Sequence, residues 1–131
     1  MKKVFLGGTC NESDWRDKLI NLLTIDYFNP VVEDWTEECM AEELKQRAAC
    51  DFCLYVITPK MSGVYSIAKV VDDSNKRPEK TIFCFINIDD CVYQFDDGQI
   101  RSLNSVGKMV ANNNGTWLKS LEEVADYLNQ K

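Results

Sequence analysis

The sequence predicts an α/β fold in which a mainly parallel, five-stranded sheet carries helices on both faces. Short apolar runs alternate along the chain with segments whose apolar residues recur at helical spacing, which is the pattern of a parallel sheet. The runs at 52–58 and 80–86 are apolar almost throughout, as is typical of strands covered on both faces. Because the chain has 131 residues, of which 45% are apolar, we expect a single domain over residues 1–131.

A strand and a helix are expected at the start of the chain. The apolar, β-prone run at 3–6 ends in two glycines. Trp15 and Leu19 follow at helical spacing, with Ser13 as the expected N-cap of that helix. The next run, at 27–32, is expected to be an edge strand because it contains a proline, which cannot donate a hydrogen bond to a neighbouring strand.

The segment 36–49 predicts the second helix. It begins with a capping threonine and has two acids in its first turn, both of which favour a helix start. Met40, Leu44 and Ala48 lie on one face of this helix. The run at 52–58 follows and stops at a proline, and we expect it to be the central strand of the sheet.

The remaining elements complete the alternation. Helical spacing returns at 64–71, and a further helix is expected at 99–111. A final amphipathic helix begins at a capping box formed by Ser120 and Glu123. The other expected elements are strands at 80–86 and 116–118, a turn at 112–115 and a surface excursion at 89–97.

Charge and composition narrow the class of partner. The net charge of −6 and the isoelectric point of about 4.6 argue against a nucleic-acid polymer or an anionic membrane surface. The chain has no histidine, so proton transfer would fall to carboxylates, tyrosine, lysine or cysteine. It has neither an apolar run long enough to span a membrane nor a signal peptide, and we expect a cytoplasmic protein.

The six cysteines predict reduced, buried thiols rather than disulfides, because they lie in apolar runs, as Cys53 and Cys84 do. Cys50 and Cys53 have the spacing of a redox or zinc motif. No second pair of cysteines and no histidine complete such a site. We therefore expect neither a metal nor a cofactor.

Ligands of parallel α/β sheets bind outside the carboxyl ends of the strands. Gly7 and Gly8 follow the first strand, and they would either let the backbone approach a phosphate or a sugar hydroxyl or form a simple tight turn. Trp15 and Trp35 would stack on a planar ring or pack in the core. The acids between residues 33 and 43 would line the cleft or form a solvated helix face. The strand ends together gather residues 7–11, 29–35, 58–65 and 87–90.

The segment after the central strand opens a helix, so that its free backbone amides would face the cleft. Tyr65 and Ser66 fall in the first turn of this helix, where side chains can reach a ligand, and Lys69 lies one turn beyond Tyr65. Asp72 and Asp73 are further along the helix, where they would either serve the site or form a polar helix end.

Four segments, KVFLGGTCN, YFNPVVEDW, CDFCLYVITP and GVYSIAKVVDDSNKRP, occur in this order and precede the ending TWLKSLEEVADYL. In order and spacing they resemble the nucleoside 2-deoxyribosyltransferase-like family over nearly the whole chain. The resemblance implies a flavodoxin-like, Rossmann-like sheet, in agreement with the alternation of elements.

Enzymes of this family exchange or hydrolyse the base of a deoxynucleoside by double displacement. A glutamate attacks the anomeric carbon, the base departs, and an acceptor base or water resolves the glycosyl-enzyme. The resemblance therefore implies a small-molecule nucleoside or nucleotide as ligand, and a homo-oligomer in which a neighbouring subunit often completes each site.

The resemblance also implies roles for residues of the cleft. Gly7 and Gly8 would line the sugar, Glu43 would hold the base, and Asn29 and Trp35 would border the base pocket. The expected substrate-binding residues are Gly7, Gly8, Thr9, Asn11, Asn29, Trp35, Glu43, Gly63 and Ser66.

The position of the nucleophile departs from the family pattern. Similar sequences carry glutamate in the YSIAE position, where this chain has Lys69, and a protonated lysine has no lone pair with which to attack carbon. Phe5 stands where many deoxyribosyltransferases have a tyrosine near the catalytic glutamate. The catalytic candidates are therefore Lys69 at the family position, Asp72 or Asp73 as its substitute, and Tyr65.

Three functions follow from these residues. The first is a nucleoside or nucleotide N-glycosyl (deoxyribosyl) transferase or hydrolase that acts by double displacement. The second is a catalytically impaired nucleoside- or nucleotide-binding protein of the same fold. The third is a scaffold or interaction module, which the glycine-bounded cleft disfavours.

Overall fold

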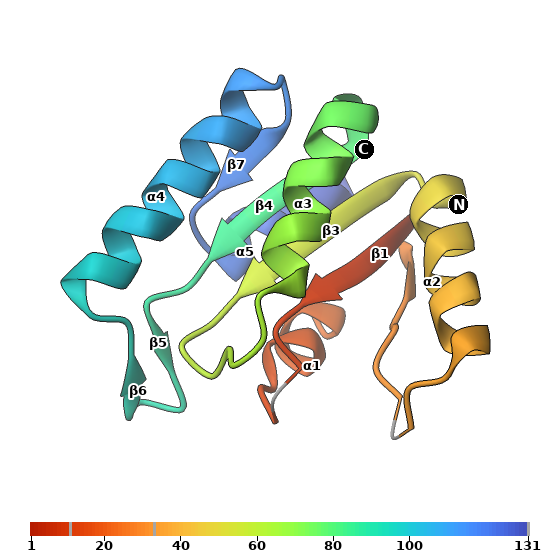
Figure 1. Cartoon of the computed structure of the whole chain (residues 1–131). Helices are drawn as coiled ribbons and strands as arrows, with labels where there is room; N and C mark the ends of the chain where they lie inside the picture. The colour runs from red at the N-terminus through yellow and green to blue at the C-terminus, as the bar shows by residue number, and fades with distance from the viewer. Residues whose placement is uncertain (11, 33, 131) are drawn as a thin grey trace.

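The computed structural model describes residues 1–10, 12–32 and 34–130. Its main sheet has five strands, all parallel, in the order β2-β1-β3-β4-β7, which is consistent with the predicted flavodoxin-like fold (Figure 1). The prediction that the run at 52–58 forms the central strand and the run at 27–32 an edge strand is confirmed. The strands are β1 (Lys3–Gly8), β2 (Asp26–Phe28), β3 (Phe52–Ile57), β4 (Thr81–Phe85) and β7 (Thr116–Leu118).

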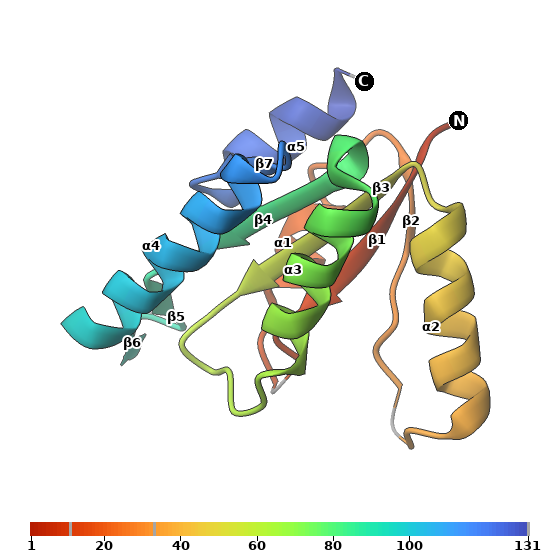
Figure 2. The ribbon, with the colours of Figure 1, turned by 45° about the horizontal axis from the view of Figure 1, so that its top comes forward.

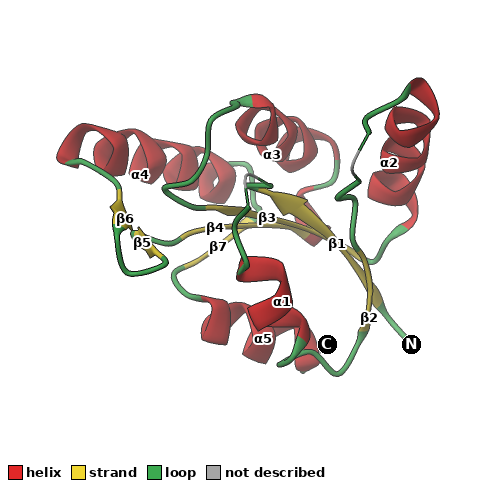
Figure 3. Cartoon of the chain, turned by 90° about the horizontal axis from the view of Figure 1, so that it is seen from below, coloured by secondary structure: helices red, strands yellow, loops and turns green. Residues whose placement is uncertain are grey.

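Helices cover both faces of the sheet, as predicted. Figure 3 shows α2, α3 and α4 on one face and α1 and α5 on the other. Their bounds are α1 (Trp15–Ile20), α2 (Glu37–Ala49), α3 (Tyr65–Lys76), α4 (Asp97–Asn112) and α5 (Leu121–Asn129), and a short 3₁₀ helix, η1 (Pro78–Lys80), precedes β4. In the described part of the chain, no helix combines the length and the apolar character needed to cross a membrane.

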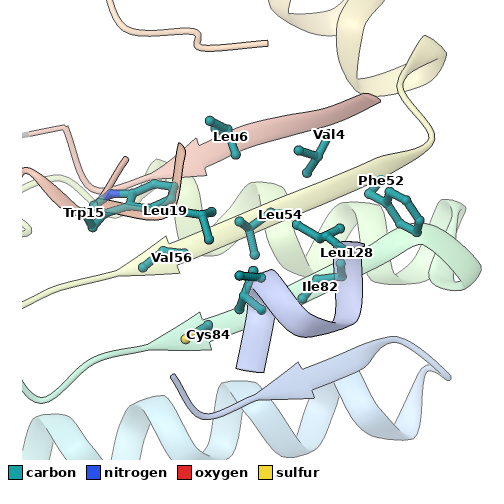
Figure 4. Packing of buried hydrophobic residues seen from close by; sticks show 12 residues of the cluster. Val4, Leu6, Trp15, Leu19, Phe52, Leu54, Val56, Ile82, Cys84 and Leu128 are labelled. Carbon is teal, nitrogen blue, oxygen red and sulfur yellow. The ribbon is translucent and has the colours of Figure 1, made fainter. Parts of the chain in front are cut away.

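The strand β3 divides the core into two layers, because successive side chains of a strand point to opposite faces. Phe52, Leu54 and Val56 belong to the layer under α1 and α5 (Figure 4). Cys53, Tyr55 and Ile57 belong to the layer under α3 and α4. All six side chains are buried, which explains why this run is apolar almost throughout. Trp15 is 1% exposed and belongs to the first layer, so it packs in the core rather than stacking on a ligand.

Helix α2 buries its charged face rather than its apolar face. Thr36 caps the helix as predicted, because its hydroxyl accepts a hydrogen bond from a backbone amide three residues on. Met40 and Leu44 are exposed, whereas Glu43 and Arg47 are buried. The apolar spacing therefore predicted the helix correctly but did not indicate the side on which it packs.

The first helix begins at a different cap from the predicted one. Asp14, not Ser13, occupies the N-cap of α1. The Ser13 hydroxyl donates instead to the Asp89 carboxylate, at 2.6 Å. Asp89 is buried, and it lies in a small antiparallel hairpin of β5 (Ile88–Asp89) and β6 (Tyr93–Gln94). The expected surface excursion is therefore partly ordered against the start of α1.

The predicted capping box of α5 is only half formed. The Ser120 hydroxyl accepts from the backbone amide of Glu123, as expected, but the Glu123 carboxylate accepts from the amide of Lys119. A complete capping box instead opens α4, where Asp96 and Gln99 bond each other's backbone amides. The sequence prediction began this helix two residues too late for that reason.

Gly107 of α4 offers a test of how closely this helix packs on β7. A Cβ atom at Gly107 would lie 2.3 Å from Cε2 of Trp117, and no real contact is that short. We expect Gly107→Ala to lower the free energy of unfolding by about 1–3 kcal/mol, because displacement of the indole outweighs the gain in helix propensity. Urea unfolding measures the change.

Gly98→Ala, in the first turn of the same helix, is the matched control. Its Cβ atom would meet only side-chain atoms, the nearest at 3.3 Å, so the stability should be unchanged or raised by up to about 1 kcal/mol. Equal stability of the two variants would contradict the packing of α4 described here.

Candidate functional site

A cavity of about 260 Å³ lies at the carboxyl end of β1, where the topology of the sheet predicts a ligand site. Figure 2 shows α2 and α3 on either side of this end of β1. Tyr65, Lys69 and seven of the expected substrate-binding residues line the cavity. The lining residues are Gly7, Gly8, Thr9, Cys10, Arg16, Pro30, Val31, Val32, Trp35, Glu43, Met61, Gly63, Tyr65, Ser66 and Lys69.

The floor of the cavity is the end of β1, which packs too closely on β3 for any residue larger than glycine. Gly8 has a φ of 123°, and a Cβ atom on it would lie 2.0 Å from the carbonyl oxygen of Val56. A Cβ atom on Gly7 would lie 2.6 Å from the Tyr55 ring. The next residue, Thr9, also contacts the segment that follows β3, because its hydroxyl accepts a hydrogen bond from the backbone amide of Thr58 at 3.0 Å. The floor is therefore backbone that is held in place by its packing on β3.

Arg16 of α1 holds the same loop from below. Its guanidinium donates to the carbonyl oxygens of Leu6 at 3.0 Å, Thr9 at 2.7 Å and Gly8 at 3.3 Å. Burial lowers the pKa of Arg16, and the neighbouring Cys10 opposes this effect. Arg16 was not among the expected site residues, since no local pattern marks an arginine beside apolar helix positions as buried.

An ion pair joins the two helical walls. Lys69 Nζ of α3 donates to Glu43 Oε1 of α2 at 2.5 Å, and the two side chains are 12% and 7% exposed. The lysine ammonium also lies 4.9 Å from the centroid of the Tyr65 ring. The predicted base-binding acid and the lysine at the nucleophile position are therefore direct partners, and Glu43 is the only carboxylate among the described residues that line the cavity.

The mouth of the cavity is apolar. Val31, Val32 and Trp35 line it and are about half exposed. Asn29 is not among the described lining residues, because its side-chain oxygen accepts from the backbone amide of Val31 and turns the chain after β2. This turn and Pro30 end β2 at residue 28, earlier than the predicted strand over 27–32. Asn11, another expected contact, lies outside the described residues.

The predicted substitution of the nucleophile by Asp72 or Asp73 receives no support from their positions, because neither lines the cavity. Asp73 is fully buried on the inner face of α3, where it accepts from Arg47 at 2.9 and 3.2 Å and from the Tyr55 hydroxyl and Arg77. Asp72 is half exposed and bonds Arg47 at 3.3 Å. Both aspartates therefore serve contacts between α2 and α3.

This buried network perturbs the groups within it. Burial raises the pKa of Tyr55, and the neighbouring Asp73 carboxylate raises it further. Burial acts to lower the pKa of Arg47, but its hydrogen bond to Asp73 and its electrostatic interactions with Tyr55, Asp73 and Asp72 together outweigh this effect, and the pKa is raised. Arg47 therefore stays charged and Tyr55 stays neutral near neutral pH.

Most acids near the cleft form a solvated helix face, which was one of the two alternatives for them. Of the described acids between residues 34 and 43, only Glu43 is buried, and Asp34, Glu37 and Glu38 are exposed.

The prediction of buried thiols holds for Cys50, Cys53 and Cys84, and it is wrong for Cys10 and Cys91, which are exposed. Burial raises the pKa of Cys53 and of Cys84 to about 12, so both stay protonated near neutral pH. Cys10 lies in the loop that follows β1, where it lines the cavity. Among the cysteines of the described chain, it is the one placed to report on a ligand there.

The two neighbouring aspartates of α3 give a test of the buried network. We expect Asp73→Asn to lower the free energy of unfolding by about 3 kcal/mol, because it leaves the charge of the buried Arg47 without its main partner. Asp72→Asn is the control, with an expected loss below about 1 kcal/mol, since Asp72 is half exposed. Chemical denaturation compares them, and equal losses would contradict the assigned roles.

A comparison with known protein families gives one match. The family model described as "Nucleoside 2-deoxyribosyltransferase like" matches residues 1–86. This region contains every described residue that lines the cavity and ends before α4, β7 and α5. No curated protein matches the chain. Because the matched region is well over half of the chain, the protein belongs to the nucleoside 2-deoxyribosyltransferase-like family.

Proposed function

We propose that the cavity binds a nucleoside or nucleotide and that the native chain does not catalyse double displacement with a carboxylate on α3. The observation that supports this proposal is the ion pair of Lys69 with Glu43, which occupies the position where the family resemblance implies a nucleophilic glutamate. A protonated, paired lysine cannot form the glycosyl ester through which that reaction proceeds.

The lining of the cavity supports a ligand with one polar and one flat, apolar part. The side chains of Ser66, Lys69 and Glu43 offer hydrogen bonds to a ligand inside the cavity, whose floor is the backbone of Gly7 and Gly8. Val31, Val32 and Trp35 form the apolar mouth. A sugar at the floor and a base at the mouth would match this division.

A second candidate is a transferase or hydrolase in which Glu43 itself attacks the anomeric carbon. It is favoured by the position of Glu43, which lines the same cavity from the opposite helix. This reaction requires Lys69 to release the carboxylate when substrate binds. Base release that is lost on Glu43→Gln would select this candidate.

Ligand binding can be followed at Cys10. We expect saturating deoxynucleoside or deoxynucleotide to raise the melting temperature, because a ligand that binds only the folded state stabilises it. The same ligand should slow alkylation of Cys10, which lines the cavity, several-fold and leave Cys91 unaffected, since that exposed thiol lies outside the cavity. Peptide mapping by mass spectrometry measures both rates. Unchanged Cys10 alkylation with every nucleoside and nucleotide tested would refute the proposed binding.

Lys69→Glu tests whether the cavity retains the geometry of a deoxyribosyltransferase. A glutamate there would face Glu43 across the cavity, and two adjacent carboxylates share a proton, which yields one nucleophile and one acid. We expect this variant to gain release of free base from deoxynucleosides, followed by chromatography. Lys69→Gln, which removes the ammonium without adding a carboxylate, should release none. If Lys69→Glu binds nucleoside but is as inactive as Lys69→Gln, the cavity is not a disabled transferase site.

A further inference from the structure

We infer that Lys69 captures an aldehyde-bearing ligand of sugar size as an imine, with Glu43 as the proton acceptor. This inference concerns a covalent step that nucleoside binding does not require. Lysine amines in cavities react in this way with carbonyl groups when a neighbouring group removes the ammonium proton.

The position of the Lys69 amine meets the geometric needs of this step. Lys69 Nζ lies 2.5 Å from Glu43 Oε1, a distance over which a proton can pass directly. The two side chains are almost removed from bulk water, yet both line the cavity, so a ligand inside can reach the nitrogen. The fixed backbone of Gly7 and Gly8 forms the floor below, and it limits the space to a small molecule.

The reaction balances without any further reagent. The Glu43 carboxylate takes one proton from the Lys69 ammonium, and the freed nitrogen lone pair forms a bond to the aldehyde carbon while the carbonyl π electrons move to oxygen. Proton transfers give a neutral carbinolamine. Glu43 then returns its proton to the hydroxyl group, which leaves as water as the carbon–nitrogen double bond forms. The product is a protonated imine, whose single positive charge keeps the ion pair with Glu43.

The expected ligand class is an open-chain aldose, for which 2-deoxyribose is the probe. The choice of this sugar rests on the proposed function, because 2-deoxyribose is what remains of a deoxynucleoside after its base is lost. The capture step itself depends only on an aldehyde that fits the cavity.

Lys60 provides a matched comparison within the same protein. Its side chain is also 12% exposed, its ammonium pairs with the Asp90 carboxylate, and it lies 5.2 Å from the centroid of the Tyr93 ring. Lys60 is not among the described residues that line the cavity. Each lysine thus has a carboxylate partner, a nearby tyrosine ring and the same exposure. They differ in access to the cavity and in the exposure of the partner carboxylate, which is 7% for Glu43 and 43% for Asp90.

The test is reductive trapping of the full chain with 2-deoxyribose and sodium cyanoborohydride, followed by peptide mapping. We expect Lys69 to acquire the reduced sugar adduct at least about tenfold faster than Lys60. Labelling of Lys69 no faster than of Lys60 would overturn the inference. Protection of Cys10 by nucleosides, measured separately, decides the proposed function, so the two can fail independently.

Two variants separate the roles of the pair. Lys69→Arg keeps the positive charge beside Glu43 without a nucleophilic amine, and labelling at residue 69 should disappear while the melting temperature is retained. Glu43→Gln should slow labelling of Lys69 about tenfold or more, because the amide cannot accept the proton. Labelling of Glu43→Gln at the wild-type rate would overturn the role given to Glu43, and circular dichroism confirms that each variant is folded.

Discussion

Two largely buried ion pairs between α2 and α3 determine where the cavity wall stands. Glu43 and Arg47 are one turn apart on α2, and they meet Lys69 and Asp73, which are one turn apart on α3. Along α2 the negative charge comes first and the positive charge second, and along α3 the order is the opposite. If one helix shifted by a turn along the other, like charges would meet. Because the apolar residues of α2 face solvent, these pairs take the place of hydrophobic packing in positioning the helix. Buried pairs of this kind add little net stability but penalise other arrangements.

The Lys69–Glu43 pair therefore has two tasks that a residue change at position 69 would separate. As a structural contact, Lys69 neutralises the buried carboxylate of Glu43. As a chemical group, it stands at the position where the family resemblance implies a nucleophilic carboxylate. A glutamate at this position would place two acids together, and one of them would be held protonated by the other. The Arg47–Asp73 pair would still connect α2 to α3 after such a change.

The sequence was sufficient to predict the five strands of the main sheet and which of them is central, because a fully apolar run such as β3 is typical of a strand covered on both faces. It also predicted the edge where the cavity lies, since the carboxyl ends of parallel strands meet there. It did not predict the β5–β6 hairpin, whose two-residue strands are too short to show a strand pattern. It also did not predict the orientation of α2. The spacing of Met40 and Leu44 indicates an apolar face that packs inward, whereas the partners of Glu43 and Arg47 lie 26 residues further along the chain and cannot be recognised from the local pattern. Arg16 was missed for a related reason, since its partners are backbone carbonyl groups, which every residue has.

The proximity of Lys69 to Glu43 also has a genetic consequence. Lysine and glutamate codons differ only in their first base, so a single point mutation converts the ion pair into a pair of carboxylates. Such a change involves neither the floor at Gly7 and Gly8 nor the Arg47–Asp73 pair. The cavity is therefore expected to keep its shape in a single mutational step. Under the proposed function, a lineage carrying this fold can therefore move in either direction between binding a nucleoside and cleaving it without rebuilding the protein.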